Sequence, residues 1–543
     1  MPLLLRVSIL IDDTTVNYNV QSYVNCQRKH DLVKDGVFTD PPTVVVVGAG
    51  VAGLAAAMTL ASMGARVTLL ERAATTGGKI RTVPSATGPV DAGPTVITMR
   101  HVFENLFRRT GSRLQDHVEL VEEPLLARHW WPGGGSLDLF ADRGRSIDAI
   151  RAFADARSAL EFERFAKESE TLFKAFQRPI IEAAEPSYSA MIRHVAMRPW
   201  LAPMIGPHQT LRQRLKKRFS DPRLAQLFGR YATYVGGSPL SSPAILSLIW
   251  HTEASGVWIV KGGVTALAEA MTQQAAAMGV DIICDTDVAR IAVGEVEDVS
   301  GRIWSGDAVL YAGDPAALRA GLLGDWPKGA VADDAVNQRS LSAYVWAFAA
   351  TPDGPAGDEP LAHHNVFFGR NAEAEFRDLA AGRPPADPTL YICAQDRGPG
   401  QSPTSAERFE IIMNGPDAPL GARPTVEEQE TCQTRTFETL TDFGLTFSPQ
   451  PGRAALTTPA DFGALFPGSG GSLYGLSPQG LDATFRRPTA RSNLAGLYLA
   501  GGGIHPGAGA PMATLSGLRA AEAIATDLAL TSRSRQTAMH GGM

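Results

Sequence analysis

Hydrophobic residues near the start of the chain follow a strand–helix–strand pattern. Residues 44–47 are four consecutive valines, which is typical of a strand buried on both faces. The alanine-rich segment that follows, to about Ser62, carries no charge and predicts a helix. A second apolar run at residues 66–70 ends at Glu71. The pattern predicts a β-α-β unit of a parallel sheet.

The turn between the first strand and the helix is rich in glycine. Gly48, Gly50 and Gly53 have the G-x-G-x-x-G spacing. The first glycine permits a tight turn, the second lets a pyrophosphate approach the backbone, and the third lets helix and strand pack closely. The N–H groups at the helix start attract phosphate. The motif predicts a dinucleotide site, and the alternative is a glycine-rich turn in an ordinary parallel sheet.

An acidic residue at the end of the second strand strengthens this prediction. Glu71 follows the glycines by about 20 residues, where an acid accepts hydrogen bonds from a ribose 2′-hydroxyl. A carboxylate at this place also repels a 2′-phosphate, which disfavours NADP. The unit therefore suits NAD or FAD.

Apolar runs farther along predict the remaining elements. Residues 146–235 carry apolar side chains at helical spacing. A strand at 256–260, a helix at 264–279 and a strand at 280–293 resemble the first unit in style. Antiparallel strands are expected within 118–142, with a hairpin at 132–135. A second, mostly β sheet is expected from runs at 340–350, 363–368, 390–394 and 409–413.

The predicted fold class is α/β, with a discontinuous Rossmann-type domain, a second mixed β-sheet domain and a helical insertion. The first domain is expected at 41–115, 256–335 and 488–535. The second is expected at 116–145 and 336–487, and the helical insertion at 146–255. Residues 1–40 are expected to be an unstructured extension, with a targeting role as the alternative, and 536–543 a tail.

Composition narrows the class of function. The formal net charge of −6 over 543 residues argues against a nucleic-acid partner. The only apolar stretch long enough to suggest a membrane span is the glycine-containing first unit, so the chain is predicted not to cross a membrane. The four cysteines form no C-x-x-C pair and no histidine–carboxylate group has ligand spacing, so no metal site is predicted.

The C-terminal segment favours a flavin. Gly501, Gly502 and Gly503 follow a short apolar strand, and Pro511 opens an alanine-rich helix. If this loop lies beside the first motif, its backbone donors and helix start can hold a ribityl chain and the electron-rich edge of a flavin ring. The alternative is a glycine loop that only ends a strand.

These motifs resemble the carotenoid desaturase branch of the FAD-dependent amine-oxidoreductase-fold proteins. The resemblance runs from about Pro42 to Thr526. The segments that carry it are VVVVGAGVAGLAAA, LLERAATTGGKIRT, DAGPTVIT, GVWIVKGGVTALAEAM and LAGGGIHPGAGAPMATLSG.

The resemblance implies FAD as the cofactor and implies the residues that bind it. The first loop would contact the pyrophosphate, Glu71 the ribose and Val288 the adenine. Lys79 stands where many relatives have arginine, so a cation remains but its planar fork is lost. The implied contacts are Gly48, Ala49, Gly50, Val51, Ala52, Gly53, Glu71, Arg72, Gly78, Lys79, Gly93, Pro94, Thr95, Val288, Gly501, Gly502, Pro511 and Met512.

A closer resemblance is to bacterial enzymes that act on 1-hydroxylated acyclic carotenoids. It rests on RLAQLFGRYATYVGG, LAHHNVFF, LYICAQDR and RFEIIMNGP. It implies insertion of a C3–C4 double bond in spheroidene-type carotenoid synthesis of a purple photosynthetic bacterium. The implied location is cytoplasmic, at the surface of the inner, photosynthetic membrane, and the implied electron acceptor is quinone or oxygen.

The chemistry requires little from side chains. Only the flavin accepts hydride, and positive charge left at C4 spreads over the polyene, so positioning is expected to matter more than a strong catalytic base. The catalytic residues are therefore not identified from the sequence. His505 is a weak candidate, and a histidine that only fixes its loop is the preferred interpretation. His363 and His364 are placed at the substrate tunnel or at an apolar strand edge.

A hydrocarbon substrate must be collected from lipid. Residues 197–206 are apolar and aromatic, and residues 211–219 contain five basic side chains, a combination that suits an anionic lipid surface. An ordinary solvated helix face is the alternative. For the whole protein the alternatives are a phytoene desaturase or another carotenoid or retinoid oxidoreductase, a flavin amine oxidase and a prenyl-lipid chaperone without enzymatic activity.

Overall fold

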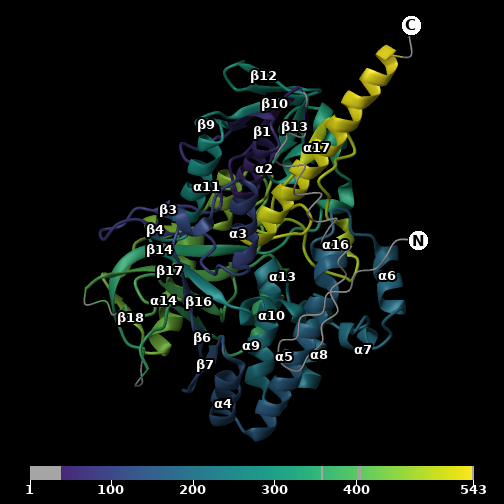
Figure 1. Cartoon of the computed structure of the whole chain (residues 1–543). Helices are drawn as coiled ribbons and strands as arrows, with labels where there is room; N and C mark the ends of the chain where they lie inside the picture. Colours follow the sequence, from purple (N-terminus) through teal and green to yellow (C-terminus); the bar gives the residue numbers. More distant parts are fainter. Residues whose placement is uncertain (1–37, 39, 356–358, 402, 404, 541–543) are drawn as a thin grey trace.

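Two β-sheets and a helical region make up the computed structural model, which describes residues 38, 40–355, 359–401, 403 and 405–540. In Figure 1 the parallel sheet lies towards the top, the larger sheet at the lower left and the helical region at the lower right. The extension predicted at 1–40 lies outside the described residues except for Phe38 and Asp40.

The first sheet is parallel and draws its strands from distant parts of the chain. Its order is β20-β13-β1-β2-β9. Every neighbouring pair is parallel. Its strands are β1 (Thr43–Val47), β2 (Arg66–Leu70), β9 (Asp281–Ile283), β13 (Ala308–Tyr311) and β20 (Leu497–Leu499). They all fall in the three ranges expected for the first domain, although the domain boundaries themselves stay a prediction.

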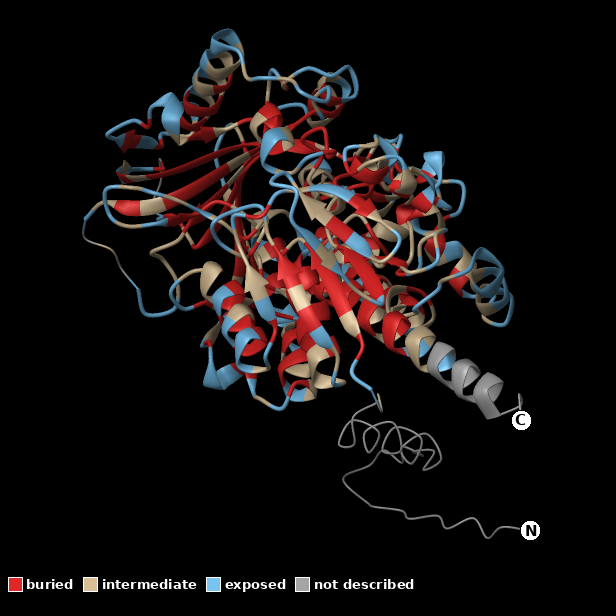
Figure 2. Ribbon diagram, turned by 90° about the horizontal axis from the view of Figure 1, so that it is seen from above, coloured by how far each residue is buried: buried red, intermediate tan, exposed pale blue. Residues whose placement is uncertain are grey.

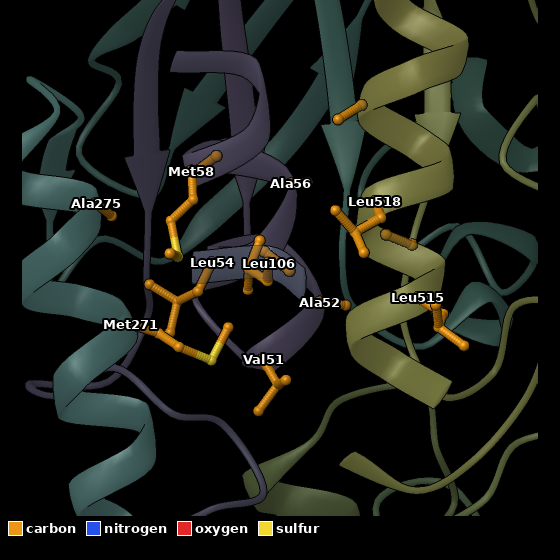
Figure 3. Packing of buried hydrophobic residues seen from close by; sticks show 14 of the residues in the cluster. Val51, Ala52, Leu54, Ala56, Met58, Leu106, Met271, Ala275, Leu515 and Leu518 are labelled. Carbon is orange, nitrogen blue, oxygen red and sulfur yellow. The ribbon is translucent and has the colours of Figure 1, made fainter. Parts of the chain in front are cut away.

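Helices cover one face of this sheet. Figure 3 shows α2 between α11 and α17, with Met271 on the side of α11 and Leu518 on the side of α17. The buried cluster that they share contains many alanines, among them Ala55, Ala275 and Ala521, and these small side chains let the helices approach closely. The helices are α2 (Val51–Ser62), α3 (Arg100–Arg109), α11 (Thr265–Ala277) and α17 (Ala510–His540).

A small antiparallel sheet and a short helix contribute to the core on the opposite face. Val45, Val47 and Val309 of the parallel sheet share one buried cluster with Ile291, Val296 and Leu318. The elements are β10 (Val288–Ala292), β11 (Glu295–Asp298), β12 (Ile303–Ser305) and α12 (Pro315–Arg319).

The second sheet is larger and mostly antiparallel. Its order is β18-β14-β17-β16-β15-β6-β7, β19 pairs with β14, and β15 runs parallel to β6. Helix α14 (Val426–Asp442) packs on one face, against Trp346 and Ile411. The strands are β6 (Leu125–Trp130), β7 (Ser136–Phe140), β14 (Ser342–Asp353), β15 (His364–Phe367), β16 (Leu390–Ala394), β17 (Glu407–Gly415), β18 (Thr446–Ser448) and β19 (Leu456–Thr457).

The helical region has its own aromatic core. The core includes four buried aromatic rings whose contacts are stacked, tilted or edge-on, namely those of Phe162, Phe165, Phe228 and Trp250. Its elements are α4 (Arg143–Phe153), α5 (Ala156–Phe176), η2 (Gln177–Ile181), α6 (Tyr188–Ala196), α7 (Leu201–Ile205), α8 (Leu211–Arg218), α9 (Pro222–Gly229), η3 (Arg230–Val235), η4 (Ala244–Leu248) and α10 (Ile249–Ala254). Helix α6 contains no buried residue.

Figure 2 shows that buried residues concentrate in the strands and in the helix faces turned towards them. Short elements connect these layers. They are β3 (Thr82–Val83), β4 (Val90–Asp91), η1 (Leu114–Asp116), η5 (Trp326–Ala330), η6 (Asp333–Ala335), α13 (Ala372–Ala380), η7 (Arg453–Ala455), α15 (Pro459–Leu465) and α16 (Ala483–Arg486).

Three elements need a fuller description than the sequence pattern provides. Residues 280–293 form two strands rather than one, because the chain turns at Asp285, whose φ of 52° lies in the left-handed region. Strand β8 (Val257–Val260) does not enter the parallel sheet but pairs with β5 (Leu120–Glu123). Helix α17 runs to His540, into the range expected to be a tail.

Candidate cofactor and substrate site

The predicted cofactor residues meet at one large cavity of about 1890 Å³. The cavity is also lined by the second sheet and by the helical region. All the predicted contacts line it except Ala49 of the first loop and Gly53 in the first turn of α2, which do not reach its surface. Segments far apart in the sequence therefore form one site, although the contacts themselves stay predictions.

The first glycine loop forms a backbone cradle. Gly48 has a φ of +102°, and a Cβ on Gly53 would lie 1.9 Å from the carbonyl oxygen of Gly48, so only glycine fits. A Cβ on Gly50 would meet nothing closer than the Cα of Gly78, at 3.9 Å. Gly50 therefore leaves open space beside the start of α2, as phosphate binding there requires.

Glu71 fixes this loop as well as lining the cavity. One carboxylate oxygen accepts from the backbone N–H of Ala49 at 2.6 Å, and the other from that of Ala73 at 2.9 Å. Each oxygen keeps a lone pair for a ligand. The backbone oxygen of Glu71 accepts from Thr286, which brings the segment of Val288 to the same end of the cavity.

Lys79 is a half-buried cation at the cavity wall. Its Nζ donates to the carbonyl oxygen of Leu473 at 2.6 Å and lies 5.4 Å from the ring centre of Phe466. Burial lowers the pKa of Lys79 to about 8, and the nearby Asp314 partly offsets this effect. The ammonium form therefore still predominates at pH 7 and offers a positive charge to a phosphate or a flavin ring.

Hydrogen bonds to the start of α11 and to the second sheet hold the loop of Gly93–Thr95 in place. Asp91 accepts from the backbone N–H of Val264 at 2.7 Å and from the Thr265 hydroxyl at 2.6 Å, at the start of α11. The Thr95 hydroxyl lies 2.8 Å from that of Tyr391 on β16. These bonds place the loop between the nucleotide-type domain and the second sheet.

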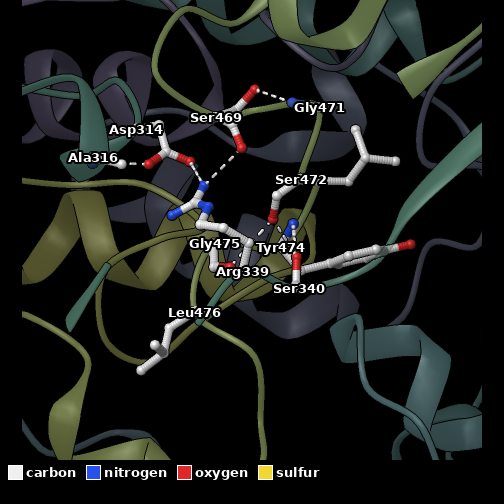
Figure 4. A network of polar contacts seen from close by, with 12 residues as sticks. Asp314, Ala316, Arg339, Ser340, Ser469, Gly471, Ser472, Tyr474, Gly475 and Leu476 are labelled. Carbon is white, nitrogen blue, oxygen red and sulfur yellow. Dashed lines mark hydrogen bonds and ion pairs between the residues drawn. The ribbon is translucent and has the colours of Figure 1, made fainter. Parts of the chain in front are cut away.

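The C-terminal glycine loop is held by arginine. Arg487 donates to the carbonyl oxygens of Gly502 at 2.9 Å and of Tyr474 at 3.0 Å. Figure 4 shows the network beside it, in which Arg339 pairs with Asp314 at 2.6 Å. In the same network the Tyr474 backbone N–H donates to Ser340. The loop and the Tyr474 segment are thus fixed together at the cavity wall.

His505 lies at the cavity wall and is uncharged at neutral pH. Neither ring nitrogen has a hydrogen-bond partner among the described residues, since the carbonyls of Ala183 and Ile180 lie nearby but outside hydrogen-bond geometry. Burial lowers the pKa of His505 to about 4. The preferred interpretation, that His505 only fixes its loop, stays a prediction.

His363 and His364 do not line the cavity. They are buried at the edge of β15, where their ring nitrogens and the Cys393 sulfur lie within 4.8 Å of one another. The sequence predicted no metal site, and this trio has the ligand types of one. His364 Nδ1 lies 2.7 Å from the Tyr391 hydroxyl and Cys393 Sγ lies 3.5 Å from His363 Nε2, whereas His364 Nε2 has no hydrogen-bond partner among the described residues. Burial also raises the pKa of the Cys393 thiol well above its usual value, which disfavours the thiolate that a metal needs.

Several cavity residues were missed from the sequence. They are Arg230, Glu375, Tyr391, Glu410, Tyr474 and Arg487. For Glu410 a signal exists, since Glu410 and Asn414 interrupt the apolar run of β17 on one face, two residues either side of Ile412. The others depend on which strands and loops pair, which no local pattern reveals.

The residues present fit FAD. The glycine loops leave space that any Cβ would reduce, Glu71 keeps free lone pairs, and Lys79 supplies positive charge. The cavity extends from these groups past the C-terminal loop to the second sheet. It therefore has room for a dinucleotide and for a further ligand beside it.

Comparisons with known proteins agree with this geometry. The family described as flavin containing amine oxidoreductase matches residues 51–354 and 451–525. The hydroxyneurosporene desaturase of Cereibacter sphaeroides is 51% identical, covering 91% of this chain and 99% of that protein. The hydroxyneurosporene desaturase of Rhodobacter capsulatus is 50% identical, covering 89% and 98%.

Among solved structures, putrescine oxidase bound to putrescine superposes with a TM-score of 0.58 at 15% identity, covering 90% of this chain and 99% of that one. At this identity the likeness supports the fold alone. The family match covers most of the sequence, and its description as flavin containing agrees with the cofactor that the cavity accommodates. The chain belongs to the flavin-containing amine oxidoreductase family, and it is an oxidoreductase whose cofactor is FAD.

Proposed function

We propose that the protein is a carotenoid desaturase that introduces a C3–C4 double bond into acyclic 1-hydroxycarotenoids. The reaction would convert 1-hydroxyneurosporene to demethylspheroidene in spheroidene-type carotenoid synthesis. The observation that carries the proposal is the relationship to hydroxyneurosporene desaturases, which share about half of their residues with this chain over nearly their whole length.

The shape of the cavity supports a long apolar substrate. From the flavin-binding end its wall continues along Val345 and Ile412 of the second sheet and reaches Ile192 and Val195 of α6. Tyr188 and Ile192 line the cavity and are also half-exposed, so we place the entrance at α6. A polyene entering there would extend towards the flavin through a largely hydrocarbon channel.

The side chains in this site position and shield the reactants. FAD, when bound, accepts the hydride. The glycine loops, Glu71 and Lys79 would hold it, while Thr95 and Tyr391 fix the loop beside it. The apolar wall excludes water, which favours spreading of positive charge over the polyene. Burial raises the pKa of two acids of the wall, Glu375 and Glu410, which favours their protonated forms, and a protonated carboxyl group cannot act as a base.

We propose that the entrance contacts a lipid surface. Exposed fractions are 48% for Tyr188, 52% for Ile192, 62% for Met197 and 58% for Trp200, all within α6 and the turn to α7. Large apolar side chains gathered in this way are typical of interfacial segments. Among the described residues no helix combines the length and hydrophobicity needed to cross a bilayer. A peripheral position at the photosynthetic membrane, with quinone or oxygen as acceptor, stays a prediction.

The basic residues of α8 support this surface less than the sequence suggested. Arg212 and Lys216 pair with Glu373, and Arg214 and Arg218 pair with Glu168. Two carboxylates thus pair with four of the cations of α8, so part of their charge is neutralised within the protein. The apolar residues of α6 and α7 are the better candidates for lipid contact.

The alternative functions can be told apart by the substrates they convert and the products they release. A flavin amine oxidase would release peroxide from amines, a phytoene desaturase would act on phytoene, and a prenyl-lipid chaperone would turn over nothing. We favour the 1-hydroxycarotenoid because the curated relatives at about 50% identity carry that name, whereas the amine oxidases match at about 15%.

The deciding experiment supplies purified FAD-loaded protein with 1-hydroxyneurosporene in vesicles, with an added quinone or under air. We expect a product that has lost two hydrogen atoms and absorbs at longer wavelength, separated by chromatography. Phytoene and putrescine serve as parallel substrates. Conversion of phytoene without conversion of 1-hydroxyneurosporene would contradict the proposal, as would peroxide formation from the amine alone.

A further inference from the structure

Glu410 is a buried acid whose carboxyl group has no partner. Glu410 lies on β17, is fully buried and lines the cavity. Neither carboxyl oxygen accepts or donates a hydrogen bond within the described part of the chain. Leaving such a group without a partner is costly, so it calls for an explanation.

The surrounding residues do not supply that explanation. Cross-strand neighbours of Glu410 are Ala347 and Cys393. Arg81 is close enough to lower the pKa of Glu410 and Asp91 to raise it, yet neither forms an ion pair or hydrogen bond with its carboxyl. Arg81 instead donates to Thr457 at 2.8 Å. The carboxyl group is thus held at the cavity wall without being used by the fold.

A second acid of the same wall shows the contrast. Glu375 is also buried, but the Thr389 hydroxyl donates to it at 2.7 Å and the Asn414 amide at 2.9 Å. The fold therefore satisfies one cavity carboxyl group completely and leaves the other open. The open one is the group available to a ligand.

Glu410 lies at the flavin-binding end of the cavity. Cys393 of β16 stands opposite Glu410, and Tyr391 lies two residues from Cys393, on the same face of that strand. The Tyr391 hydroxyl contacts Thr95, which is one of the predicted cofactor contacts. A ligand group that reaches Glu410 is therefore close to the atoms that would react.

We propose that the carboxyl group of Glu410 binds the terminal hydroxyl group of the carotenoid and selects 1-hydroxylated substrates. This inference rests on the proposed function. C1 is only two carbons from C3, so whatever holds the hydroxyl group also places C3 and C4. A hydroxyl group can both donate and accept a hydrogen bond. A protonated carboxyl group offers it one acceptor oxygen and one O–H donor.

The charge state of Glu410 agrees with this role. Burial, followed by the charge of Asp91, raises the pKa of Glu410 well above its usual value and so favours the neutral carboxyl group. A neutral partner can bind an uncharged alcohol without a buried ion. A hydrocarbon end group would leave the carboxyl group desolvated and unpaired, which is the condition under which a polar pocket rejects an analogue.

The test compares binding of 1-hydroxyneurosporene and of neurosporene, which lacks the hydroxyl group, from phosphatidylcholine vesicles. Quenching of the flavin fluorescence of the FAD-loaded protein gives each dissociation constant. We expect the wild type to prefer the hydroxylated carotenoid by about tenfold or more. Glu410→Met should abolish the preference, whereas Glu410→Gln, which keeps a donor and an acceptor, should retain much of it.

Ile412→Val is the matched control, since it alters the adjacent position of the same wall without a polar group. It should change both dissociation constants alike and keep their ratio. Thermal unfolding should show that Glu410→Met is at least as stable as the wild type, because it removes an unpaired buried carboxyl group.

Two results would overturn the role of Glu410: an unchanged preference in Glu410→Met, or a wild type that binds both carotenoids equally. A wild type that prefers the hydroxylated carotenoid but does not desaturate it would instead refute the proposed function and leave the role of Glu410 supported.

Discussion

Gly50 and Gly53 belong to one motif but are needed for different physical reasons. Gly53 packs against the backbone of its own loop, so a side chain there disturbs the fold. Gly50 has open space where its Cβ would be, so a side chain there disturbs only what occupies that space. The motif alone assigned these roles, and the contacts agree with the assignment.

We therefore predict that Gly50→Ala keeps the fold and loses the cofactor. The added methyl group meets the protein only at ordinary contact distance but projects towards the phosphates. FAD affinity should fall about tenfold or more, measured by titration of the apoprotein, while the apoprotein melts as the wild type does. Gly452→Ala, with no neighbour within 4 Å of its Cβ, is the control and should bind FAD normally. Equal FAD affinity in both variants would contradict the assignment.

Glu375 should make stability depend on pH. Burial raises its pKa to about 7 from 4.5, so the folded protein retains a proton that the unfolded chain loses earlier. Stability due to this group is thus full below about pH 4.5 and decreases as the pH rises to about 7, by roughly 3 kcal/mol at most.

Glu375→Gln removes this titration. The difference in unfolding free energy between variant and wild type should shift in favour of the variant from pH 5 to pH 8, measured with denaturant at each pH. Other groups titrate alike in both proteins and cancel. A difference that stays constant over this range would show that Glu375 is already ionised in the folded protein at pH 5.

At the scale of elements, the crossing of α2 and α17 sets the position of the first glycine loop. A Cβ on Gly517 would lie 2.2 Å from the carbonyl oxygen of Ala52. Ala52 itself lines the cavity. The two helices, more than 400 residues apart in the sequence, therefore approach as closely as their backbones allow.

Gly517→Ala should destabilise the protein although alanine is the better helix former. The backbone of α2 must shift to admit the methyl group, and we expect a net loss of about 1–3 kcal/mol. The shift should also weaken FAD binding, because it moves the start of α2. Gly452→Ala again serves as control, by chemical unfolding of both apoproteins. A more stable Gly517→Ala would mean that the helices separate without cost.

Most elements were predictable because their signals are local. Strands β1 and β13 are short apolar runs, and α2 and α17 are alanine-rich segments next to glycine loops. The features that the sequence pattern did not reveal depend on pairing between distant segments. Strand β8 has the same character as a strand of the parallel sheet, and only its pairing with β5 assigns it elsewhere. The site shows the same limit, since Tyr391 and Thr95 meet across almost 300 residues.

At the scale of the whole molecule, the two ends of the cavity differ in chemistry, one being polar and charged and the other apolar. One end is built from backbone donors, Glu71 and Lys79, and suits a charged dinucleotide. The other reaches the surface among exposed apolar side chains of α6. This contrast between the two ends suits a protein that takes a hydrocarbon from lipid and presents it to a cofactor supplied from water.

Replacing Met197 and Trp200 together by serine should weaken transfer from lipid without altering the reaction site. We expect reduced co-sedimentation with vesicles and slower desaturation of vesicle-borne carotenoid, because the lost apolar area no longer enters the interface. Activity with detergent-dispersed carotenoid should stay near that of the wild type. Leu420→Ser is the control, since Leu420 is 60% exposed on another part of the chain. If the Leu420 variant loses as much vesicle binding as the double variant, exposed hydrophobicity in general, and not the entrance at α6, holds the protein to lipid.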